Sequence, residues 1–445
     1  MNNLKETITI KKNNKEVLNH KVSPTKKKAA LTILKIATAG SVDDGKSTLI
    51  GRLLYDTKSL TSDKLEAIER TSKQKGFDYL DFSLATDGLV AEREQGITID
   101  VAHIYFSTAT KSYIIADTPG HVEYTRNMVT GASTSQAAII LIDARKGVIE
   151  QTNRHFFINN LLRIKDVIVA VNKMDLVDFS EEIYKVITSD FQKLMAKRDY
   201  QEQQITFIPV SALKGDNVVH ASKNMTWYQG QTVLEHLEKL KTTDIYNTGT
   251  PRFPVQYVIR PKTANFHDFR GYAGKVYGGE LSVGDEVVVL PSHTTSKIKD
   301  IYFYDKKYRT ASRRTSVTLT LEDDINISRG DMIVKANDLP TIEKQCTAIL
   351  TWMDLKKLVS GNKYTLQHGV HKVLAKVVQV HHKIHPDYSG IDATVETLGI
   401  NDIALVSFKL NKPIYYDAFK NHRTNGSFIL IDTQTNNTVG VGCIQ

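Results

Sequence analysis

A segment with two glycines, one lysine and three hydroxyl residues carries the clearest chemical signal in the sequence. Residues 40–48 read Gly-Ser-Val-Asp-Asp-Gly-Lys-Ser-Thr, which fits the phosphate-loop pattern G-x-x-x-x-G-K-[ST]. Glycines let such a loop turn tightly, so that its backbone N–H groups point at phosphate oxygens. We expect Lys46 to neutralise the β- and γ-phosphates and the Ser47 hydroxyl to ligate Mg²⁺. The whole loop is a candidate nucleotide-binding segment: Gly40, Ser41, Val42, Asp43, Asp44, Gly45, Lys46, Ser47 and Thr48.

Two carboxylates inside this loop, Asp43 and Asp44, should repel phosphate by like charge. Two interpretations remain open. The side chains could point outward as a solvated pair, or Asp43 could hold a cation beside the phosphates.

A second group of residues is typical of a site that acts on the γ-phosphate. The sequence Asp117-Thr-Pro-Gly-His121 follows an apolar run, and a charged loop containing Thr98 precedes it. We expect Asp117 to hold Mg²⁺ through water and the Gly120 N–H to contact the γ-phosphate. His121 would then position the attacking water as the catalytic residue. Thr98 would close over Mg²⁺ and the γ-phosphate, and its loop would relax once that phosphate is gone.

A third group predicts which base is bound. Asp175, in Asn172-Lys-Met-Asp175, can accept both the N1–H and the 2-amino group of guanine, whereas adenine would leave a buried carboxylate unpaired. Asn172 would contact the base, and the stem of Lys173 would pack on its face. Backbone N–H groups of a second loop would reach the guanine oxygen: Ser211, Ala212 and Leu213.

These motifs follow apolar runs that read as strands, and helical patterns alternate with those runs. Strands are expected at 31–39, 113–117, 137–142, 167–171 and 205–210, and helices at 48–55, 151–162 and 232–240. This order predicts a mainly parallel sheet with helices on both faces, an α/β domain whose ligands bind at the carboxyl ends of the strands.

The pattern changes near residues 248–254, where the helical period largely disappears. Short strands alternate with turns, which is typical of small antiparallel β-barrels. Strands are expected at 255–259, 271–276, 286–290, 316–321, 345–352, 373–380, 392–397, 402–410 and 427–431. A break near Leu339-Pro340 separates two barrels. The predicted domains are therefore a basic, disordered tail (1–30), a phosphate-loop GTPase domain (31–248), barrel 2 (249–340) and barrel 3 (341–445).

Composition excludes several classes of protein. The net charge is +9, but residues 1–30 contribute +6 of it, so the body is nearly neutral and no long nucleic-acid groove is expected. No apolar run is long enough for a membrane helix, and no secretory signal is visible, so we expect a cytoplasmic protein without membrane contact. The histidines of 381–385 alternate as on a strand, which favours solvated sheet positions over a metal site.

Together, the five motifs resemble those of the translation-factor GTPases. Within that group the chain is most similar to the large, GTPase subunits of sulfate adenylyltransferase (ATP sulfurylase), over about residues 32–445. Asp44 also resembles this family, because elongation factors usually have His at that place. The strings that carry the resemblance lie at 40–54, 86–101, 116–128, 252–258 and 268–274.

The resemblance implies a GTP-hydrolysing subunit that forms a heterodimer with a small subunit. That partner would bind ATP and sulfate and form adenosine 5′-phosphosulfate and pyrophosphate, and GTP hydrolysis with Mg²⁺ would help drive the reaction. In translation-type GTPases an Asp at the place of Asp43 can contact a monovalent cation. Residues 249–445 contain no second phosphate loop, so we expect no kinase activity on the product. The alternative is an elongation-factor-like GTPase that delivers aminoacyl-tRNA.

Overall fold

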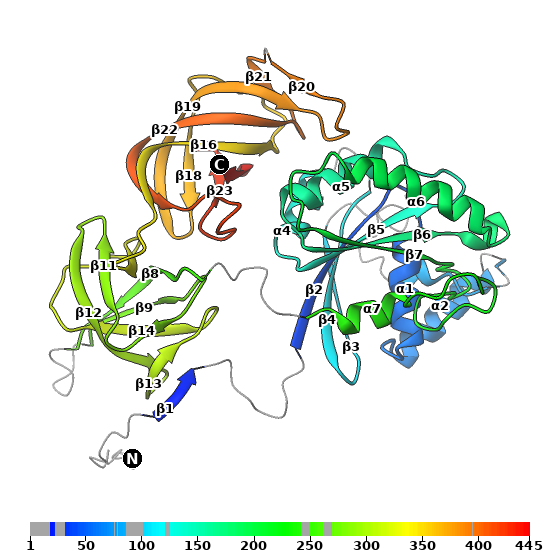
Figure 1. Ribbon diagram of the computed structural model, residues 1–445, viewed down its shortest axis with the longest axis horizontal. Helices are drawn as coiled ribbons and strands as arrows, with labels where there is room; N and C mark the ends of the chain where they lie inside the picture. The colour runs from blue at the N-terminus through cyan, green and yellow to red at the C-terminus, as the bar shows by residue number, and fades with distance from the viewer. Residues whose placement is uncertain are drawn as a thin grey trace, which may run out of the picture.

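The computed structural model describes most of the chain, and two of the predicted site residues, Thr98 and His121, lie outside the part it describes. Three domains are arranged as an arch, with the α/β domain at one end, barrel 2 at the other and barrel 3 between them (Figure 1). The described residues are 18–22, 32–74, 76–77, 79–85, 101–120, 125–241, 249–261, 269–393 and 395–445.

The α/β domain is built on a six-stranded, mainly parallel sheet, which contains the five expected strands and one further strand, β3. Its order is β3-β4-β2-β5-β6-β7, and every neighbouring pair is parallel except β3 with β4. All seven residues of β5 are buried, because β5 is a central strand with both faces covered. The strands are β2 (Thr32–Ala39), β3 (Ala102–Ser107), β4 (Lys111–Asp117), β5 (Ala137–Asp143), β6 (Asp166–Asn172) and β7 (Gln204–Pro209).

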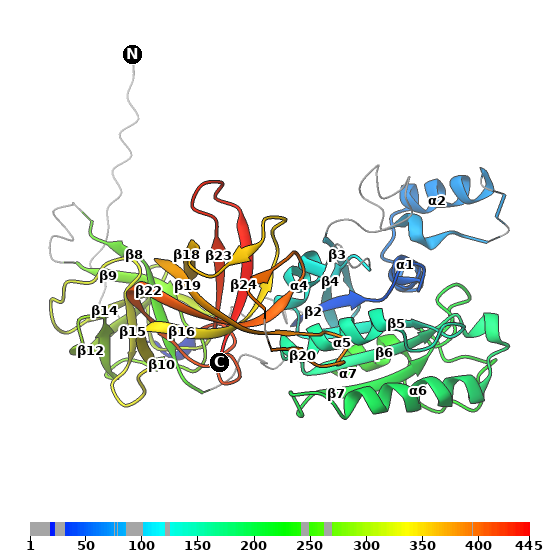
Figure 2. The same ribbon diagram turned by 90° about the horizontal axis from the view of Figure 1, so that it is seen from above.

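Helices cover both faces of this sheet (Figure 2). The apolar sides of α4 (Thr125–Ser133), α5 (Glu150–Leu161) and α6 (Glu181–Met195) share one apolar cluster with one face of the strands. Those of α1 (Lys46–Asp56) and α7 (Val233–Lys239) share a second cluster with the opposite face. The helix α2 (Ser62–Gln74) contacts the short helix η1 (Phe82–Ala85). The predicted doubly covered α/β fold is confirmed.

Barrel 2 closes through a pairing between β12 and β14, which joins the ends of the order β12-β11-β15-β8-β9-β14. Strands β12 and β13 were not expected from the sequence. For β13 the reason is that only one of its six residues, Ala311, is buried, so the strand has no apolar pattern. The strands are β8 (Arg252–Ile259), β9 (Gly271–Lys275), β10 (Leu281–Ser282), β11 (Glu286–Leu290), β12 (Thr294–Phe303), β13 (Lys306–Ala311), β14 (Ser316–Leu321) and β15 (Met332–Lys335).

Barrel 3 closes in the same way, through β18 and β19. The expected single strand at 392–397 is wrong: among its described residues only the two ends are extended, and they pair with different partners, β20 with β19 and β21 with β17. The strands are β16 (Thr341–Trp352), β17 (Leu358–Val359), β18 (Lys363–His368), β19 (His371–Ile384), β20 (Ile391–Asp392), β21 (Thr397–Leu398), β22 (Ile403–Tyr416), β23 (Ser427–Ile431) and β24 (Thr438–Ile444).

One short strand lies within the predicted disordered tail. β1 (Leu18–Val22) pairs in parallel with β13 of barrel 2. Main-chain pairing does not depend on the apolar content on which the prediction of disorder was based. This explains why composition does not indicate the strand.

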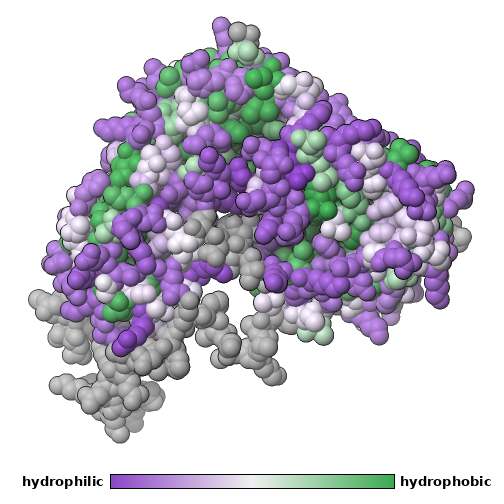
Figure 3. Space-filling model, in the orientation of Figure 1, coloured by the Kyte–Doolittle hydropathy of each residue, from purple (hydrophilic) through white to green (hydrophobic). Residues whose placement is uncertain are grey.

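Barrel 3 also packs directly on the α/β domain. Phe419 and Cys443 belong to the same apolar cluster as α4 and α5. The ring of Tyr388 lies 5.3 Å from that of Phe157 on α5. Hydrophilic side chains cover most of the face shown in Figure 3, and apolar residues appear on it in scattered groups. No helix in the described part of the chain is both long enough and apolar enough to cross a membrane.

Candidate functional site

The phosphate-loop segment connects the end of β2 to the start of α1. Gly45 precedes the first helical residue with φ 92° and ψ 32°, in the left-handed region. A Cβ on Gly45 would lie 2.4 Å from the Asn172 side-chain nitrogen, so both the conformation and the space require glycine. The positive end of α1 therefore begins at Lys46, within the loop.

Lys46 lies in the centre of this loop. Its Nζ donates hydrogen bonds to the carbonyls of Gly40 at 2.8 Å and Ser41 at 3.1 Å. Burial lowers the pKa of Lys46, and the carboxylates of Asp117, Asp44 and Asp43 act in the opposite direction. A charged amine at the loop centre is thus supported by acidic neighbours from two motifs.

Asp117 and Gly120 approach the loop from the end of β4. Asp117 is only 2% exposed, and Thr38 Oγ1 on β2 donates to its Oδ1 at 2.9 Å. A Cβ on Gly120 would lie 2.3 Å from the Gly40 carbonyl oxygen and 2.6 Å from Lys46 Nζ. The glycine therefore permits this close approach, and the structure brings the first two motifs together.

The two loop aspartates have different surroundings. Asp43 is exposed, with φ 67°. Asp44 is 2% exposed, and its Oδ2 accepts a hydrogen bond of 2.6 Å from the Ser41 N–H. The interpretation of an outward, solvated pair is therefore wrong for Asp44. Burial raises the pKa of Asp44, while the Ser41 N–H, Lys46 and Lys146 lower it.

Asn172 joins the phosphate loop to the two predicted base loops. Its Nδ2 donates to the Asp44 carbonyl at 2.8 Å, and its Oδ1 accepts from the Ala212 N–H at 2.9 Å. Ser211 Oγ donates to Asp175 Oδ1 at 2.6 Å. The third and first motifs are therefore held together by one side chain.

Lys173 and Leu213 lie beside this junction. Lys173 has φ 63°, and its Nζ is 3.0 Å from Asp143 Oδ2. The Leu213 carbonyl accepts from Arg52 Nη1 of α1 at 3.4 Å. Of the predicted residues, Val42, Ser47 and Thr48 lie in the described loop and first turn of α1.

Asp143 was not predicted as part of the site, although its position at the end of β5 matches those of Asp117 and Asn172 on β4 and β6. Arg145 Nη2 donates to its Oδ2 at 2.6 Å, in addition to the contact with Lys173. Burial alone would raise the pKa of Asp143, but the hydrogen bonds from Arg145 and Lys173 hold it well below its usual range.

Gln151 and His155 on α5 were also missed. Gln151 Nε2 donates to the Gly120 carbonyl at 3.0 Å and lies 3.3 Å from His155 Nε2. His155 is 1% exposed, and burial, with Lys46 and Arg154 nearby, lowers its pKa to about 3. It is therefore neutral at pH 7. The spacing of four on a helix was the only signal that could have linked the two.

Comparison with known proteins agrees with these motifs. Residues 31–243 match the family described as Elongation factor Tu GTP binding domain, and residues 345–445 match GTP-eEF1A C-terminal domain-like. The chain is 47% identical to "Sulfate adenylyltransferase subunit 1" of Bacteroides fragilis over 93% of this chain and 86% of that protein.

Two further relatives cover the same part of the chain. "Sulfate adenylyltransferase subunit 1" of Alteromonas mediterranea is 48% identical over 93% of this chain and 86% of that protein. "Bifunctional enzyme CysN/CysC" of Mycobacterium tuberculosis is 47% identical over 93% of this chain and 67% of that protein. The chain therefore belongs to the sulfate adenylyltransferase subunit 1 family, within the GTPases that share the elongation factor Tu type of GTP-binding domain.

Proposed function

We propose that this chain is the GTP-hydrolysing subunit of a sulfate adenylyltransferase of the cytoplasm. With a small ATP-binding subunit it would couple GTP hydrolysis to the formation of adenosine 5′-phosphosulfate and pyrophosphate from ATP and sulfate, in sulfate assimilation. The names of the relatives support the overall reaction. One observation supports a GTP-binding role for this chain above the others. The Asn172 side chain bonds both the Asp44 carbonyl and the Ala212 N–H, and it thereby joins the phosphate loop to a predicted base loop.

Asp175 would select the base. It follows β6 in a short helical turn, and its carboxylate is held by Ser211 Oγ. Because this hydrogen bond fixes the orientation of the carboxylate, the other oxygen and the free lone pairs can accept the two N–H groups of guanine. Adenine offers neither group, and it would be rejected.

The residues present fit a magnesium ion. Asp117 supplies a buried carboxylate at the end of β4, and Ser47 supplies a hydroxyl next to Lys46. Mg²⁺ prefers oxygen ligands, and it is commonly held by one or two protein groups together with phosphates and waters. When bound, the ion would neutralise charge that develops on the β- and γ-phosphates.

The chain's own groups would then position the reactants. Lys46 would contact the phosphates, the Gly120 N–H would contact the γ-phosphate, and Thr98 would close over it with Mg²⁺. His121 would orient the attacking water, because phosphoryl transfer depends on positioning and electrostatics. Gln151 would support this turn by fixing the Gly120 carbonyl.

A monovalent cation near Asp43 is part of the same proposal. The exposed carboxylate of Asp43 lies in a loop that would hold triphosphate, and a cation between them would remove the repulsion. Turnover of GTP should then be faster in K⁺ than in a bulky organic cation at equal ionic strength.

Reconstitution tests the proposal. Phosphosulfate formation would be measured with the chain alone, the small subunit alone, both together, and both with Lys46→Ala. We expect GTP-dependent product only with both wild-type subunits. Lys64→Ala, an exposed lysine on α2, is the matched control and should behave as the wild type.

Two results would contradict the proposed roles of the two subunits. They are phosphosulfate formation by this chain alone, and equal phosphosulfate formation by the small subunit with Lys46→Ala and with the wild-type chain. Delivery of aminoacyl-tRNA is not favoured, because relatives at 47–48% identity over most of the chain are named as sulfate adenylyltransferase subunits.

A further inference from the structure

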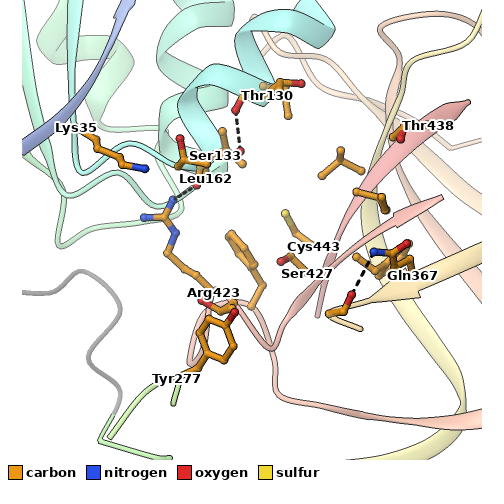
Figure 4. A pocket seen from close by; sticks show the side chains of 18 of the residues that line it. Lys35, Thr130, Ser133, Leu162, Tyr277, Gln367, Arg423, Ser427, Thr438 and Cys443 are labelled. Atoms are coloured by element: carbon orange, nitrogen blue, oxygen red, sulfur yellow. Dashed lines mark hydrogen bonds between the residues drawn. The ribbon is translucent and has the colours of Figure 1, made fainter. Parts of the chain in front are cut away.

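A cavity of about 860 Å³ lies where all three domains meet. The α/β domain contributes Lys35 of β2 and the last part of α4, barrel 2 contributes β9 and the turn after Ser312, and barrel 3 contributes β23, β24 and the segment before β23. Figure 4 shows side chains from these elements facing a common space. None of the described residues that line the cavity belongs to the candidate nucleotide site.

The described charged residues that line this cavity are all cations. Among the described lining residues there is no aspartate or glutamate, and there are five lysines and arginines: Lys35, Lys275, Arg313, Arg314 and Arg423. The charges act on one another, since burial, then Arg314 and Lys35, lowers the pKa of Lys275. Positive charges from barrel 2 (Lys275 and Arg314) and from the α/β domain (Lys35) therefore line the same cavity.

Arg423 adds a fixed part to this cationic wall. It is 7% exposed, and its Nη2 donates to the Ser133 carbonyl at the end of α4 at 3.3 Å (Figure 4). This bond spans barrel 3 and the α/β domain, so the guanidinium has a defined place at the domain junction.

Apolar and aromatic residues form the rest of the cavity wall, beside the cations. Phe419 and Phe428 are 6% and 3% exposed, and Tyr277 is half-buried with Lys275 Nζ 5.9 Å from its ring centre. Pockets that hold small organic molecules usually have about 300–1,000 Å³ and combine apolar walls with a few polar groups. The cavity thus has the size and the composition of a site for a small molecule with one apolar and one anionic part.

We propose that this cavity binds an organic anion with at least two phosphate or sulfate groups, of the nucleotide class, at a site separate from that for GTP. Lys35 and Lys275 would pair with the anionic groups, and the ring of Tyr277 would pack against the organic part.

The position of α4 gives this site a route to the nucleotide site. α4 starts five residues after Gly120, and its Val129, Thr130 and Ser133 line the cavity. A ligand that favours one position of α4 would change GTP affinity, and GTP would change the affinity of that ligand by the same factor.

Calorimetric titration tests this. The purified chain would first be saturated with GDP and Mg²⁺, and then titrated with ADP and, separately, with inorganic pyrophosphate. Retained GDP would be measured afterwards, so that displacement from the guanine site is recognised. Failure of the chain to take up GDP would count against the proposed function, not against the cavity.

We expect one additional site for ADP whose affinity falls as salt rises, and weaker binding of pyrophosphate, which lacks the organic part. The double variant Lys35→Gln/Lys275→Gln should lose about 100-fold in ADP affinity, since each lost charged contact changes affinity about tenfold or more. The control Lys64→Gln/Lys306→Gln removes two exposed lysines from the same two domains and should leave ADP affinity unchanged.

Three results would overturn the proposal. They are no binding of ADP to the GDP-loaded chain, ADP binding that survives in the Lys35→Gln/Lys275→Gln variant, and pyrophosphate binding as tight as that of ADP.

Discussion

At the scale of single residues, Asn172 makes two contacts with the protein that the sequence did not indicate. Both ends of its amide already contact the protein, at the Asp44 carbonyl and the Ala212 N–H. Its bond to Asp44 also explains why Gly45 must be glycine, since the same amide nitrogen would collide with a Cβ there. Asn172 therefore fixes the distance between the phosphate loop and the base loop, and the expected contact with the base stays a prediction.

Base choice should depend on Asp175. In Asp175→Asn an acceptor is replaced by a donor, so guanine would meet a mismatched partner and xanthine a suitable one. We expect GTP affinity to fall by about 100-fold or more, the usual cost of leaving hydrogen-bonding groups unpaired in a site, and XTP affinity to rise. Fluorescence titration with labelled nucleotides measures both. Asp178→Asn, an exposed aspartate in the same turn, is the control. Equal GTP affinity of Asp175→Asn and wild type would contradict the assignment.

Site residues could be predicted from the sequence where a local motif after a strand determines their position in the sheet. Lys46 and Asp117 belong to this group, because a loop after a buried strand must emerge at one edge of the sheet. Gln151 does not, since its contact with Gly120 joins residues 31 positions apart through the packing of α5. Asp143 could have been found, because it ends β5 as Asp117 ends β4.

At the scale of elements, α5 carries the partly buried Gln151 and the buried His155 one turn apart, beside the Gly120 turn. Gln151 uses its amide hydrogens for the Gly120 carbonyl and His155 Nε2, which requires a neutral His155 with its proton on Nδ1. The pKa of about 3 agrees with a neutral ring. Helix α5 therefore couples the protonation state of the His155 imidazole to the turn at Gly120.

Acid should destabilise the protein through His155. The folded pKa is about 3 and the ordinary value is 6.5, so between these values the unfolded chain binds more protons. The contribution of His155 is thus complete above pH 6.5 and is lost as the pH falls toward 3. We expect His155→Leu to show a flatter dependence of the unfolding midpoint on pH in this range, measured in urea. Asn159→Leu, a buried but non-titrating residue of α5, should keep the wild-type slope. An unchanged slope in His155→Leu would contradict the argument.

The two barrels are joined by a buried ion pair. Arg252 of β8 is 1% exposed and donates to both oxygens of Asp417, at 3.0 and 2.8 Å. Burial alone would raise the pKa of Asp417, but Arg252 holds it below the usual value. The geometry is bidentate, which fixes the orientation of barrel 3 on barrel 2.

Asp417→Asn should leave a buried guanidinium without its counter-charge. Breaking a buried pair from one side costs about 3–5 kcal/mol. Asp338→Asn removes the second, 40% exposed carboxylate at 3.4 Å and should cost less than about 1 kcal/mol. Trp352 of barrel 3 reports unfolding of this part in a Trp227→Phe background, since the chain has two tryptophans. Equal losses in the two variants would show that the pair is not the main link.

At the element scale the sequence also has clear limits. Strands with one buried face, such as β14 and β16, were predicted, whereas the short pieces β20 and β21 were merged into one strand. Their partners, β19 and β17, belong to different sheets. Alternation along a segment does not show which neighbour each residue pairs with.

At the scale of the whole molecule, the arch places barrel 3 against α4 and α5, the helices that flank the Gly120 turn (Figure 1). A change at the γ-phosphate could therefore reach the barrels through α4, which Arg423 contacts at Ser133. Coupling of this kind needs an element with two positions that both sites favour differently.

Thr98→Ala should separate GTP binding from coupling. Thr98 would close over the γ-phosphate, so the variant should bind GTP within about tenfold of the wild type but lose stimulation of the partner. GTP affinity and phosphosulfate formation with the small subunit are the two measurements. Thr110→Ala, on an exposed turn, is the control. Full stimulation by Thr98→Ala would show that another element transmits the signal.

Ring closure of the barrels restricts how any second subunit can attach. In the described part of the chain, each barrel joins its first and last ring strands, and β13, beside the ring of barrel 2, already pairs with β1, β10 and β12. A partner therefore cannot extend either ring by adding a strand of its own, which needs free main-chain donors and acceptors along an edge. Among the described strands, such edges occur at β3 and β7, the outer strands of the α/β sheet, and beside the rings at the short strands β1 and β20. Recognition on the rings themselves must therefore rest on side chains, and point substitutions on the ring surfaces will be enough to map it.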